Sequence, residues 1–243
     1  MRDELMLMYS WMKFVEVAPE RYDWAVKVMT AGRLDRIKDI IAQAIHANDR
    51  VLDIGCGTGT LALRCLRRGA HVTGLDSSAF MLEQSQKNAT AEGLDHELVL
   101  IKDSVTQLRK HFADESFDVV MSTMALGEFP HQYLQYILRD CLRILKPGGR
   151  LIIADEVWPE GRAGRLIYQA VLALSWVPQF LLLRRVTYPI GNLRGIIKEA
   201  GFNLTDFQTW SGTSFQLVFA EKVAAQESFA RQPSKLISVA LTT

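Results

Sequence analysis

Apolar and polar positions along the chain form two alternating patterns. Short runs rich in Val, Ile and Leu have the length of buried parallel strands and begin near residues 51, 71, 97, 117 and 150. Between these runs, apolar residues recur every three or four positions, as on a helix that buries one face. Segments 202–210 and 214–223 are expected to form an antiparallel pair that closes the sheet. The pattern predicts an α/β fold, with helices on both faces of a mostly parallel sheet.

Helices are predicted ahead of the first strand and after the second. Apolar residues at helical spacing predict an amphipathic helix over residues 3–17, which Pro19 ends. An isoleucine stripe predicts a core-facing helix near residues 37–45. Ser77 is positioned to cap a helix over residues 79–92. We therefore expect a helical segment at the N-terminus that leads into the sheet.

Length and composition fit one domain. With 243 residues, 49% of them hydrophobic, the chain has room for one sizeable α/β domain. We expect an N-terminal helical cap over residues 1–46, a main domain over 47–223 and a C-terminal tail over 224–243. The formal net charge of +1 argues against a general nucleic-acid binder, so no nucleic-acid partner is expected.

The cysteines and the N-terminal residues indicate the cellular compartment of the protein. Cys56, Cys65 and Cys141 have neither the C-x-x-C spacing of a metal or redox site nor a pairing pattern. We expect buried thiols in a reducing cytoplasm and no metal site. Asp3, Glu4 and the lack of a cleavage site argue against a secretory signal. The prediction is a cytoplasmic protein.

Residues 51–59 read as a short buried strand that runs into a glycine-rich turn and then into a helix. Gly55, Gly57 and Gly59 let the backbone turn tightly and approach a ligand where any Cβ would collide. The N-terminal amides of the helix over residues 60–66 favour an anionic group. This arrangement predicts a cofactor site.

The spacing of glycines and acids separates two classes of cofactor. The dinucleotide fingerprint is G-x-G-x-x-G, whereas this loop reads G-x-G-x-G and is preceded by Asp53. Asp76 ends the next apolar run, where a ribose-binding carboxylate is expected. A nicotinamide dehydrogenase shares the strand, the glycine turn and the ribose acid, but its third glycine is missing here. It stays as the less favoured alternative.

Two further motifs extend the pattern beyond the glycine loop. An F-D-x-V motif opens the run at residue 117, and L-K-P-G-G precedes the run at residue 150. Together with the D-x-G-x-G-x-G loop, these motifs resemble the class I S-adenosylmethionine-dependent methyltransferases, from about residue 20 to residue 221. The resemblance implies S-adenosylmethionine as cofactor and S-adenosylhomocysteine as product. It also implies a Rossmann-like, seven-stranded methyltransferase sheet.

The resemblance implies roles for individual residues. The loop around Gly55 and Gly57 would hold the methionine part, and Asp76 would bind the ribose hydroxyls. Met81 would contact the adenine, although a methionine on a helix is usually core filler. Asp103 would accept from the adenine amino group, or else only start a turn. The other predicted cofactor contacts, which neighbour these positions, are Asp53, Cys56, Ser77, Ser104 and Ser122.

A Tyr-Asp pair near the N-terminus adds a second resemblance. Residues 20–24 are similar to the segment that folds over the cofactor in ubiquinone/menaquinone-biosynthesis C-methyltransferases. Tyr22 is therefore a candidate cofactor contact and Arg33 a weaker one. The alternative is that Tyr22 only joins the N-terminal helix to the core. The segment also resembles methyltransferases found beside corrinoid proteins, which makes a corrinoid or other protein an alternative partner.

Methyl transfer from a sulfonium is an in-line displacement, so the enzyme mainly aligns donor and acceptor. Ser122, Thr123 and Met124, at the carboxyl end of the fourth strand, would face the transferred methyl group. Where a proton must be removed, Glu128 and His131 are the candidate catalytic residues. His131 has the alternative of a solvated residue at a helix start. The other candidate bases, both just beyond a strand end, are Asp155 and Glu156.

The methyl acceptor is open at this point. Residues 125–130 lack the asparagine- and arginine-containing stretch of the quinone-pathway relatives, which puts a quinol acceptor in doubt. The apolar residues of 11–24 and 166–188 favour a small hydrophobic or aromatic acceptor. The alternative is a non-catalytic protein that binds the cofactor while serving a partner.

One long segment has a distinctive charge pattern. Residues 161–198 contain six basic residues and no acid, and they enclose a long apolar run with Pro178 inside it. We expect a helical lid over the substrate site, inserted before the final hairpin. The alternative is a peripheral contact with anionic lipid at the inner membrane surface. A membrane span is disfavoured, because both flanks return to the same sheet and Pro178 breaks the helix.

Overall fold

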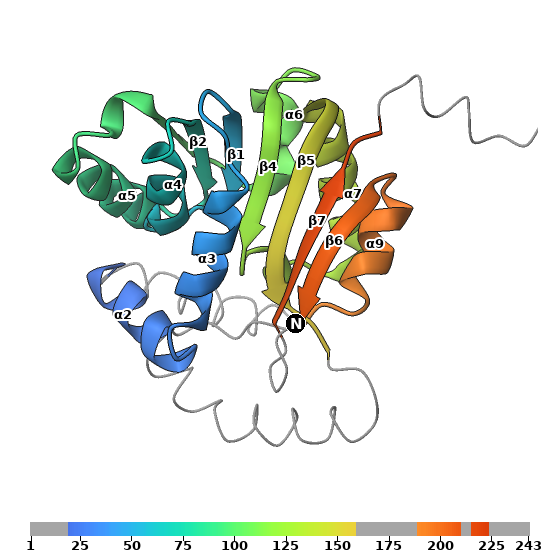
Figure 1. Ribbon diagram of the computed structural model, residues 1–243, viewed down its shortest axis with the longest axis horizontal. Coiled ribbons are helices and arrows are strands. Elements are labelled where there is room, and N and C mark those ends of the chain that lie inside the picture. Colours follow the sequence, from blue (N-terminus) through green and yellow to red (C-terminus); the bar gives the residue numbers. More distant parts are fainter. Residues whose placement is uncertain (1–18, 159–188, 210–214, 224–243) are drawn as a thin grey trace, which may run out of the picture.

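The protein folds around one seven-stranded sheet. The computed structural model describes residues 19–158, 189–209 and 215–223 (Figure 1). The strand order is β3-β2-β1-β4-β5-β7-β6, with β7 antiparallel to both β5 and β6. The strands are β1 (Arg50–Ile54), β2 (His71–Asp76), β3 (Leu98–Lys102), β4 (Phe117–Thr123), β5 (Leu145–Glu156), β6 (Asn203–Thr209) and β7 (Phe215–Glu221). The predicted Rossmann-like, seven-stranded sheet and its closing antiparallel pair are confirmed.

Helices cover both faces of the sheet. Helices α3 and α4 pack on one face of β1, β4 and β5. Helices α7 and α9 pack on the opposite face of the same strands. The α-helices are α2 (Pro19–Met29), α3 (Arg33–Gln43), α4 (Thr60–Leu66), α5 (Ala79–Ala91), α6 (Leu108–His111), α7 (His131–Ile144) and α9 (Leu193–Glu199). The described residues also form the short 3-10 helices η1 (Asp95–Glu97), η2 (Val105–Gln107) and η3 (Leu126–Glu128). The core therefore has two layers, one on each face of the sheet.

The alternation of side chains along each strand decides which layer a residue joins. In β1, Val51 packs with α3 and α4, whereas Leu52 packs with α7. Asp53 therefore falls on the same face as Val51, beneath α3 and α4. By the same alternation Asp155, two residues after Ile153, falls on the α7 face. Two buried acids thus enter the core from opposite sides.

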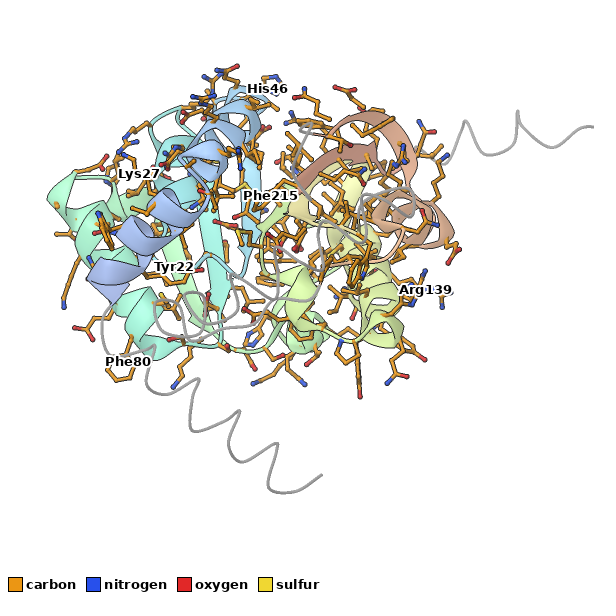
Figure 2. All side chains as sticks on the ribbon, turned by 90° about the horizontal axis from the view of Figure 1, so that it is seen from below. Tyr22, Lys27, His46, Phe80, Arg139 and Phe215 are labelled. Atoms are coloured by element: carbon orange, nitrogen blue, oxygen red, sulfur yellow. The ribbon has the colours of Figure 1, made fainter. Side chains whose placement is uncertain are left out.

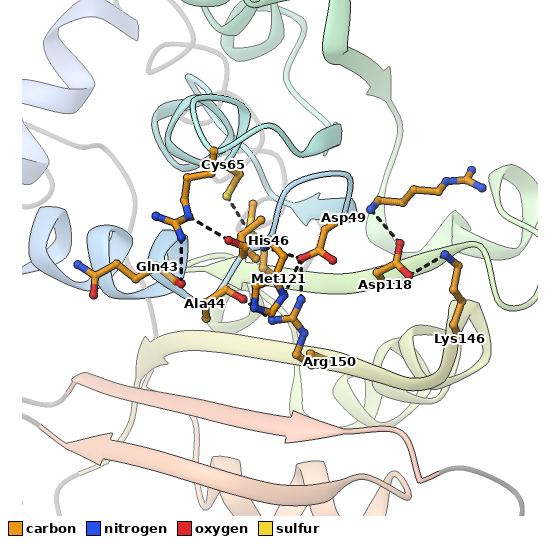
Figure 3. Close-up of polar contacts among 12 residues, drawn as sticks. Gln43, Ala44, His46, Asp49, Cys65, Asp118, Met121, Lys146 and Arg150 are labelled. Atoms are coloured by element: carbon orange, nitrogen blue, oxygen red, sulfur yellow. Dashed lines mark hydrogen bonds and ion pairs between the residues drawn. The ribbon is translucent and has the colours of Figure 1, made fainter.

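Polar contacts fix the amino ends of the strands (Figure 3). Arg150, at the start of the regular part of β5, forms an ion pair with Asp49 (Nη2 to Oδ2, 2.6 Å) and donates to the carbonyl of Ala44. Asp118 accepts from Lys146 at 2.6 Å and from the amide of Arg50 at 2.9 Å. These contacts occupy the edge of the sheet opposite to the strand ends that carry the glycine loop.

Two helix boundaries differ from the sequence prediction. Pro19 begins α2 rather than ending a helix, because its fixed φ suits the first helical turn. The cap of α5 is Ser78, whose hydroxyl accepts from the amide of Met81 at 3.4 Å, and not Ser77. The predicted helix over residues 3–17 lies outside the described residues.

The predicted lid is described only at its C-terminal end. Ile190 forms a bridge with Val157, and α9 buries Leu193, Ile196 and Ile197 in the α7 layer. The buried side chains of α9 therefore pack into the core layer that contains α7. Residues 161–188, and the predicted tail over 224–243, lie outside the described part of the chain. In the part that is described, no helix is long and apolar enough to cross a membrane.

Candidate active site

A cleft opens at the carboxyl ends of the parallel strands. It is partly open to solvent, and both apolar side chains and carboxylates line it. It lies where the strand order reverses between β1 and β4, the position at which open α/β sheets bind ligands. The walls are formed by Tyr22, Ile54, Gly55, Gly57, Leu75, Asp76, Ser77, Met81, Asp103, Ser104, Val105, Thr123, Met124, Ala125, Glu128 and Phe129.

Helix α2 borders this cleft. Figure 1 shows α2 beside the lower edge of the sheet, toward which β4 and β5 point. Figure 2 views that edge from below and labels Tyr22 on α2 beside the strands. Tyr22 lines the cleft, so one residue from outside the central sheet unit reaches the candidate site.

The glycine loop is held tightly against its neighbours. The amides of Gly55 and Cys56 donate to the carbonyl of Leu75 at 2.8 and 3.2 Å. Gly55 has φ +67°, and a Cβ at this position would lie 2.3 Å from the Cβ of Ala125. Only glycine fits there, because both the backbone conformation and the space exclude a side chain. The loop therefore presents bare backbone to the cleft.

Asp76 is oriented by two backbone amides. Its Oδ2 accepts from the amide of Gly57 and its Oδ1 from the amide of Ser78, both at 2.9 Å. The first contact joins the end of β2 to the glycine loop, and the second starts the turn into α5. The carboxylate is thus fixed on the cleft wall, with further lone pairs available to hydroxyl donors.

Asp103 is held by a cluster of donors at the end of β3. Its Oδ2 pairs with His111 Nε2 at 2.7 Å and with Lys110 Nζ at 3.0 Å. Its Oδ1 accepts from the amide of Ser104 at 2.8 Å. The hydrogen bonds, that from His111 foremost, hold the pKa of Asp103 well below its usual range. The sequence prediction did not include Lys110 and His111, which lie seven and eight residues further along the chain.

Asp53 lies behind the loop and not on the cleft wall. It is buried, and neither carboxylate oxygen has a hydrogen-bond partner among the described residues. Burial raises its pKa to about 7; the Lys38 ammonium opposes this rise and the Asp76 carboxylate adds to it. Cys56 is also behind the loop: a Cβ on Gly74 would meet its Sγ at 2.8 Å. Burial raises the pKa of that thiol well above its usual range.

Asp155 supports the loop that follows β4. Its Oδ2 accepts from the amides of Leu126 and Gly127 at 3.0 and 3.1 Å, and its Oδ1 from the amide of Glu156 at 2.8 Å. Burial raises its pKa to about 7, against the effect of these hydrogen bonds. Asp155 is fully enclosed in the α7 layer and off the cleft wall. It anchors the 3-10 turn η3, whose last residue, Glu128, does line the cleft.

Two other candidates are placed away from the cleft. His131 is exposed as the first residue of α7, which agrees with the alternative of a solvated helix start. Ser122 is buried, and its hydroxyl donates to the carbonyl of Ile54 at 3.1 Å instead of facing the cleft. Thr123 and Met124, the next residues along the chain, line it. The prediction that Ser122 faces a ligand is therefore wrong, and the residues that face the cleft begin one position later, at Thr123.

The raised pKa of Asp53 gives the protein a pH-dependent stability. In the unfolded chain this carboxyl loses its proton near pH 4, but in the folded protein near pH 7. The folded state binds more protons between these values, so the contribution of Asp53 is most favourable below about pH 4 and is lost as pH rises to about 7. Replacing Asp53 by Asn should raise the free energy of unfolding at pH 8 by about 2–3 kcal/mol.

Urea unfolding of the ligand-free protein at pH 5 and pH 8 measures this effect. At pH 5 only the part of this loss that falls between pH 4 and pH 5 has occurred, so Asp53→Asn should raise the free energy of unfolding clearly less at pH 5 than at pH 8. Asp39→Asn serves as the control, because Asp39 is an exposed acid that pairs with Arg64 on the surface. A variant that is equally destabilised at both pH values would contradict the assignment of a buried, strained carboxylate.

Known proteins resemble this chain in both sequence and fold. Residues 51–149 match the family described as "Methyltransferase domain". A ubiquinone/menaquinone biosynthesis C-methyltransferase of Rhizobium meliloti is 33% identical over 215 residues, which cover 79% of this chain and 81% of that protein. A 27-O-demethylrifamycin SV methyltransferase of Amycolatopsis mediterranei is 33% identical over 56% of this chain and 48% of that protein.

A solved structure shows the same architecture. The geranyl diphosphate C-methyltransferase of Streptomyces coelicolor, in complex with Mg²⁺, geranyl diphosphate and S-adenosyl-L-homocysteine, superposes with a TM-score of 0.61. At 16% identity it covers 79% of this chain and 80% of that one. The chain belongs to the class I S-adenosylmethionine-dependent methyltransferases. For three of the curated relatives, however, the match spans only 40%, 48% and 54% of their own length.

Proposed function

We propose that this chain transfers the methyl group of S-adenosylmethionine to a small hydrophobic or aromatic acceptor. The observation that carries the proposal is the cleft itself, where the bare glycine loop, Asp76 and Asp103 meet along one wall. A glycine loop alone occurs in many nucleotide sites. The combination with a carboxylate at the end of β2 and another just after β3 fits a ligand that has both a ribose and an adenine.

The residues present fit this cofactor. Asp76 would accept from the two ribose hydroxyls, since its carboxylate is already oriented by the amides of Gly57 and Ser78. Asp103, kept ionised by His111, would accept from the adenine amino group, with Met81 against the ring. The methionine part would lie along Gly55, where a Cβ would take the space. The bound sulfonium would supply an activated methyl group.

The chain's own residues then have to align an acceptor and exclude water. Thr123, at the end of β4, and Met124 and Phe129, just after it, give the cleft a largely apolar wall beside the glycine loop. Glu128 is the one carboxylate on the described cleft wall that lacks a proposed cofactor role. It would take a proton from a carbon or oxygen acceptor and hold it at its carboxylate. Asp155 would fix the turn that presents Glu128.

The names of two similar proteins support an acceptor with an apolar part. One belongs to ubiquinone/menaquinone biosynthesis, and the other was solved with geranyl diphosphate, whose carbon chain is apolar. The apolar half of the cleft wall is compatible with such a group, whereas a highly charged acceptor would leave its charges unpaired there. A corrinoid or other protein partner and a peripheral membrane contact rest on the sequence alone and remain predictions.

Turnover with a labelled donor tests the proposal. Purified protein is incubated with methyl-labelled S-adenosylmethionine and either a set of prenylated and aromatic hydroxy compounds or a set of sugars and nucleotides. We expect label transfer only to the first set. Glu128→Gln should lower kcat about a hundredfold, as expected for a lost general base, and leave the Kd for S-adenosylhomocysteine unchanged.

Asp114→Asn, on the surface beside Arg143, is the matched control and should retain full turnover. Preference for hydrophilic, charged acceptors would contradict the proposed acceptor class. Tight donor binding without transfer to any compound would favour the accessory, non-catalytic alternative. An unchanged kcat in Glu128→Gln would remove Glu128 from the mechanism while leaving methyl transfer intact.

A further inference from the structure

Two hydrogen bonds join the glycine loop, on the side away from the cleft, to helices α2 and α3. Thr58 Oγ1 donates to Asp23 Oδ1 of α2 at 2.8 Å. Lys38 Nζ, from α3, donates to Thr60 Oγ1. The two threonines flank Gly59, where the loop turns into α4 with φ +78°. The loop is therefore held from behind at the two positions on either side of its sharpest turn.

These contacts are partly shielded from water. Thr58 is buried, with 2% of its surface exposed. Burial raises the pKa of Asp23, although the Thr58 hydrogen bond and the Lys38 ammonium act in the opposite direction. Burial lowers the pKa of Lys38, against the attraction of Asp23 and Asp53. Partly buried charges contribute little net stability, and their best-attested use is to fix one geometry.

The position of Asp23 links this contact to the cleft. Its neighbour Tyr22 lines the cleft, while Trp24, the next residue, is 62% exposed. Val26, one turn further on, is buried and completes the inner face of α2. Asp23 thus supplies a hydrogen-bond acceptor from α2 to the glycine loop, next to a residue that lines the cleft.

We propose that Asp23 and Lys38 are positioning residues that couple the seating of α2, and with it Tyr22, to the shape of the glycine loop. Neither side chain lines the cleft, so both would act through their contacts with α2 and with the end of the glycine loop, whose Gly55 and Gly57 do line it. Asp23 acts through Tyr22 on its own helix and through Thr58 on the loop. Lys38 acts through Thr60 and balances the charges of Asp23 and Asp53. This inference rests on the proposed binding of S-adenosylmethionine in the cleft.

Calorimetric titration with S-adenosylhomocysteine tests the coupling. Asp23→Ala should raise the Kd about tenfold, the effect of losing one hydrogen bond to a charged group. Asp23→Asn keeps an oxygen that accepts from Thr58, so it should change the Kd less than Asp23→Ala does. Thr58→Val removes the contact from its other side and should match Asp23→Ala. Asp39→Ala, which breaks an exposed pair with Arg64, is the control and should bind as the wild type does.

A double variant distinguishes positioning from general stabilisation. If Asp23 acts through Tyr22, Asp23→Ala should have little further effect on the Kd in a Tyr22→Ala background. Effects that multiply in the double variant would overturn the coupling through Tyr22. A variant with a lower melting temperature but an unchanged Kd would overturn the positioning role and leave a structural contact only.

Hydrogen exchange of the ligand-free protein keeps this inference separate from the proposed function. In Asp23→Ala, amides of residues 20–29 and of the glycine loop should both exchange faster than in the wild type. If the wild type fails to bind S-adenosylhomocysteine, the proposed cofactor is wrong, but faster exchange in both segments still supports the coupling of α2 to the loop. Faster exchange in α2 alone, with an unchanged loop, overturns it.

Discussion

Replacing Asp76 by Ala is expected to raise the Kd for S-adenosylhomocysteine about a thousandfold. Two hydrogen bonds from ribose hydroxyls to a carboxylate are worth about 1.5–3 kcal/mol each, and each 1.4 kcal/mol is a factor of ten. The same substitution also removes the acceptor for the amides of Gly57 and Ser78, which loosens the glycine loop. Isothermal titration calorimetry at constant pH measures the change directly.

Cys56→Ala is the matched control for Asp76→Ala. Cys56 belongs to the same loop, but its thiol is buried against Gly74 on the side away from the cleft. The substitution should lower the stability slightly through a small cavity and change the Kd by no more than about twofold. Equal binding by Asp76→Ala and the wild type would show that no ribose contacts this carboxylate.

Replacing Gly55 by Ala is expected to abolish cofactor binding and to destabilise the fold by about 2–4 kcal/mol. The new methyl group would lie 2.3 Å from the Cβ of Ala125, so one of the two loops has to move. The backbone conformation, with φ +67°, adds about 1–2 kcal/mol of strain for a residue with a Cβ. Thermal unfolding, followed by titration of the folded fraction, measures both effects.

Gly93→Ala separates backbone strain from the clash. Gly93 has nearly the same φ, +68°, but a Cβ there would meet nothing within 4 Å, and the residue follows α5 away from the cleft. We expect a loss of about 1 kcal/mol from strain alone and an unchanged Kd. If Gly55→Ala binds the cofactor as well as Gly93→Ala does, the glycine loop is not part of the binding site.

The fold was predictable because its signals are local. The strand at Val51 runs straight into the glycines, and the period of the apolar residues changes from strand to helix at the same point. The same local view failed where two neighbours were chemically alike. Ser77 and Ser78 are equal as caps by residue type, and only the turn that Asp76 imposes on the chain decides for Ser78. A proline can either end a helix or occupy the first turn of one, so the sequence pattern could not show which of the two applies to Pro19.

The site was predictable where it lies at strand ends, and less so where contacts cross between elements. Asp76 and Asp103 end or follow strands and line the cleft as expected. His111, which orients Asp103, and Asp155, which holds the turn before Glu128, come from other elements and leave no periodic signal. Ser122 was misplaced because strand ends alternate between faces, so a shift of one residue exchanges cleft for core.

Asp53 belongs to the glycine-loop motif but does not line the cleft. The sequence placed it with the glycines, and it is indeed next to them, but on the face of β1 that α3 covers. Its link to the cleft is electrostatic and not a direct contact, because the Asp76 carboxylate on the cleft wall helps to raise the pKa of Asp53. Binding of a positively charged sulfonium nearby would favour the ionised form of Asp53.

Parallel titrations of the wild-type protein with S-adenosylhomocysteine and with NAD test the central claim most directly. Both ligands carry an adenosine, so a generic nucleotide cleft would accept either, whereas a methyltransferase cleft accepts the first. We expect saturable binding of one S-adenosylhomocysteine per chain, lost in Asp76→Ala, and no saturable binding of NAD. Saturable binding of NAD with none of S-adenosylhomocysteine would contradict the claim and return the chain to the dehydrogenase alternative.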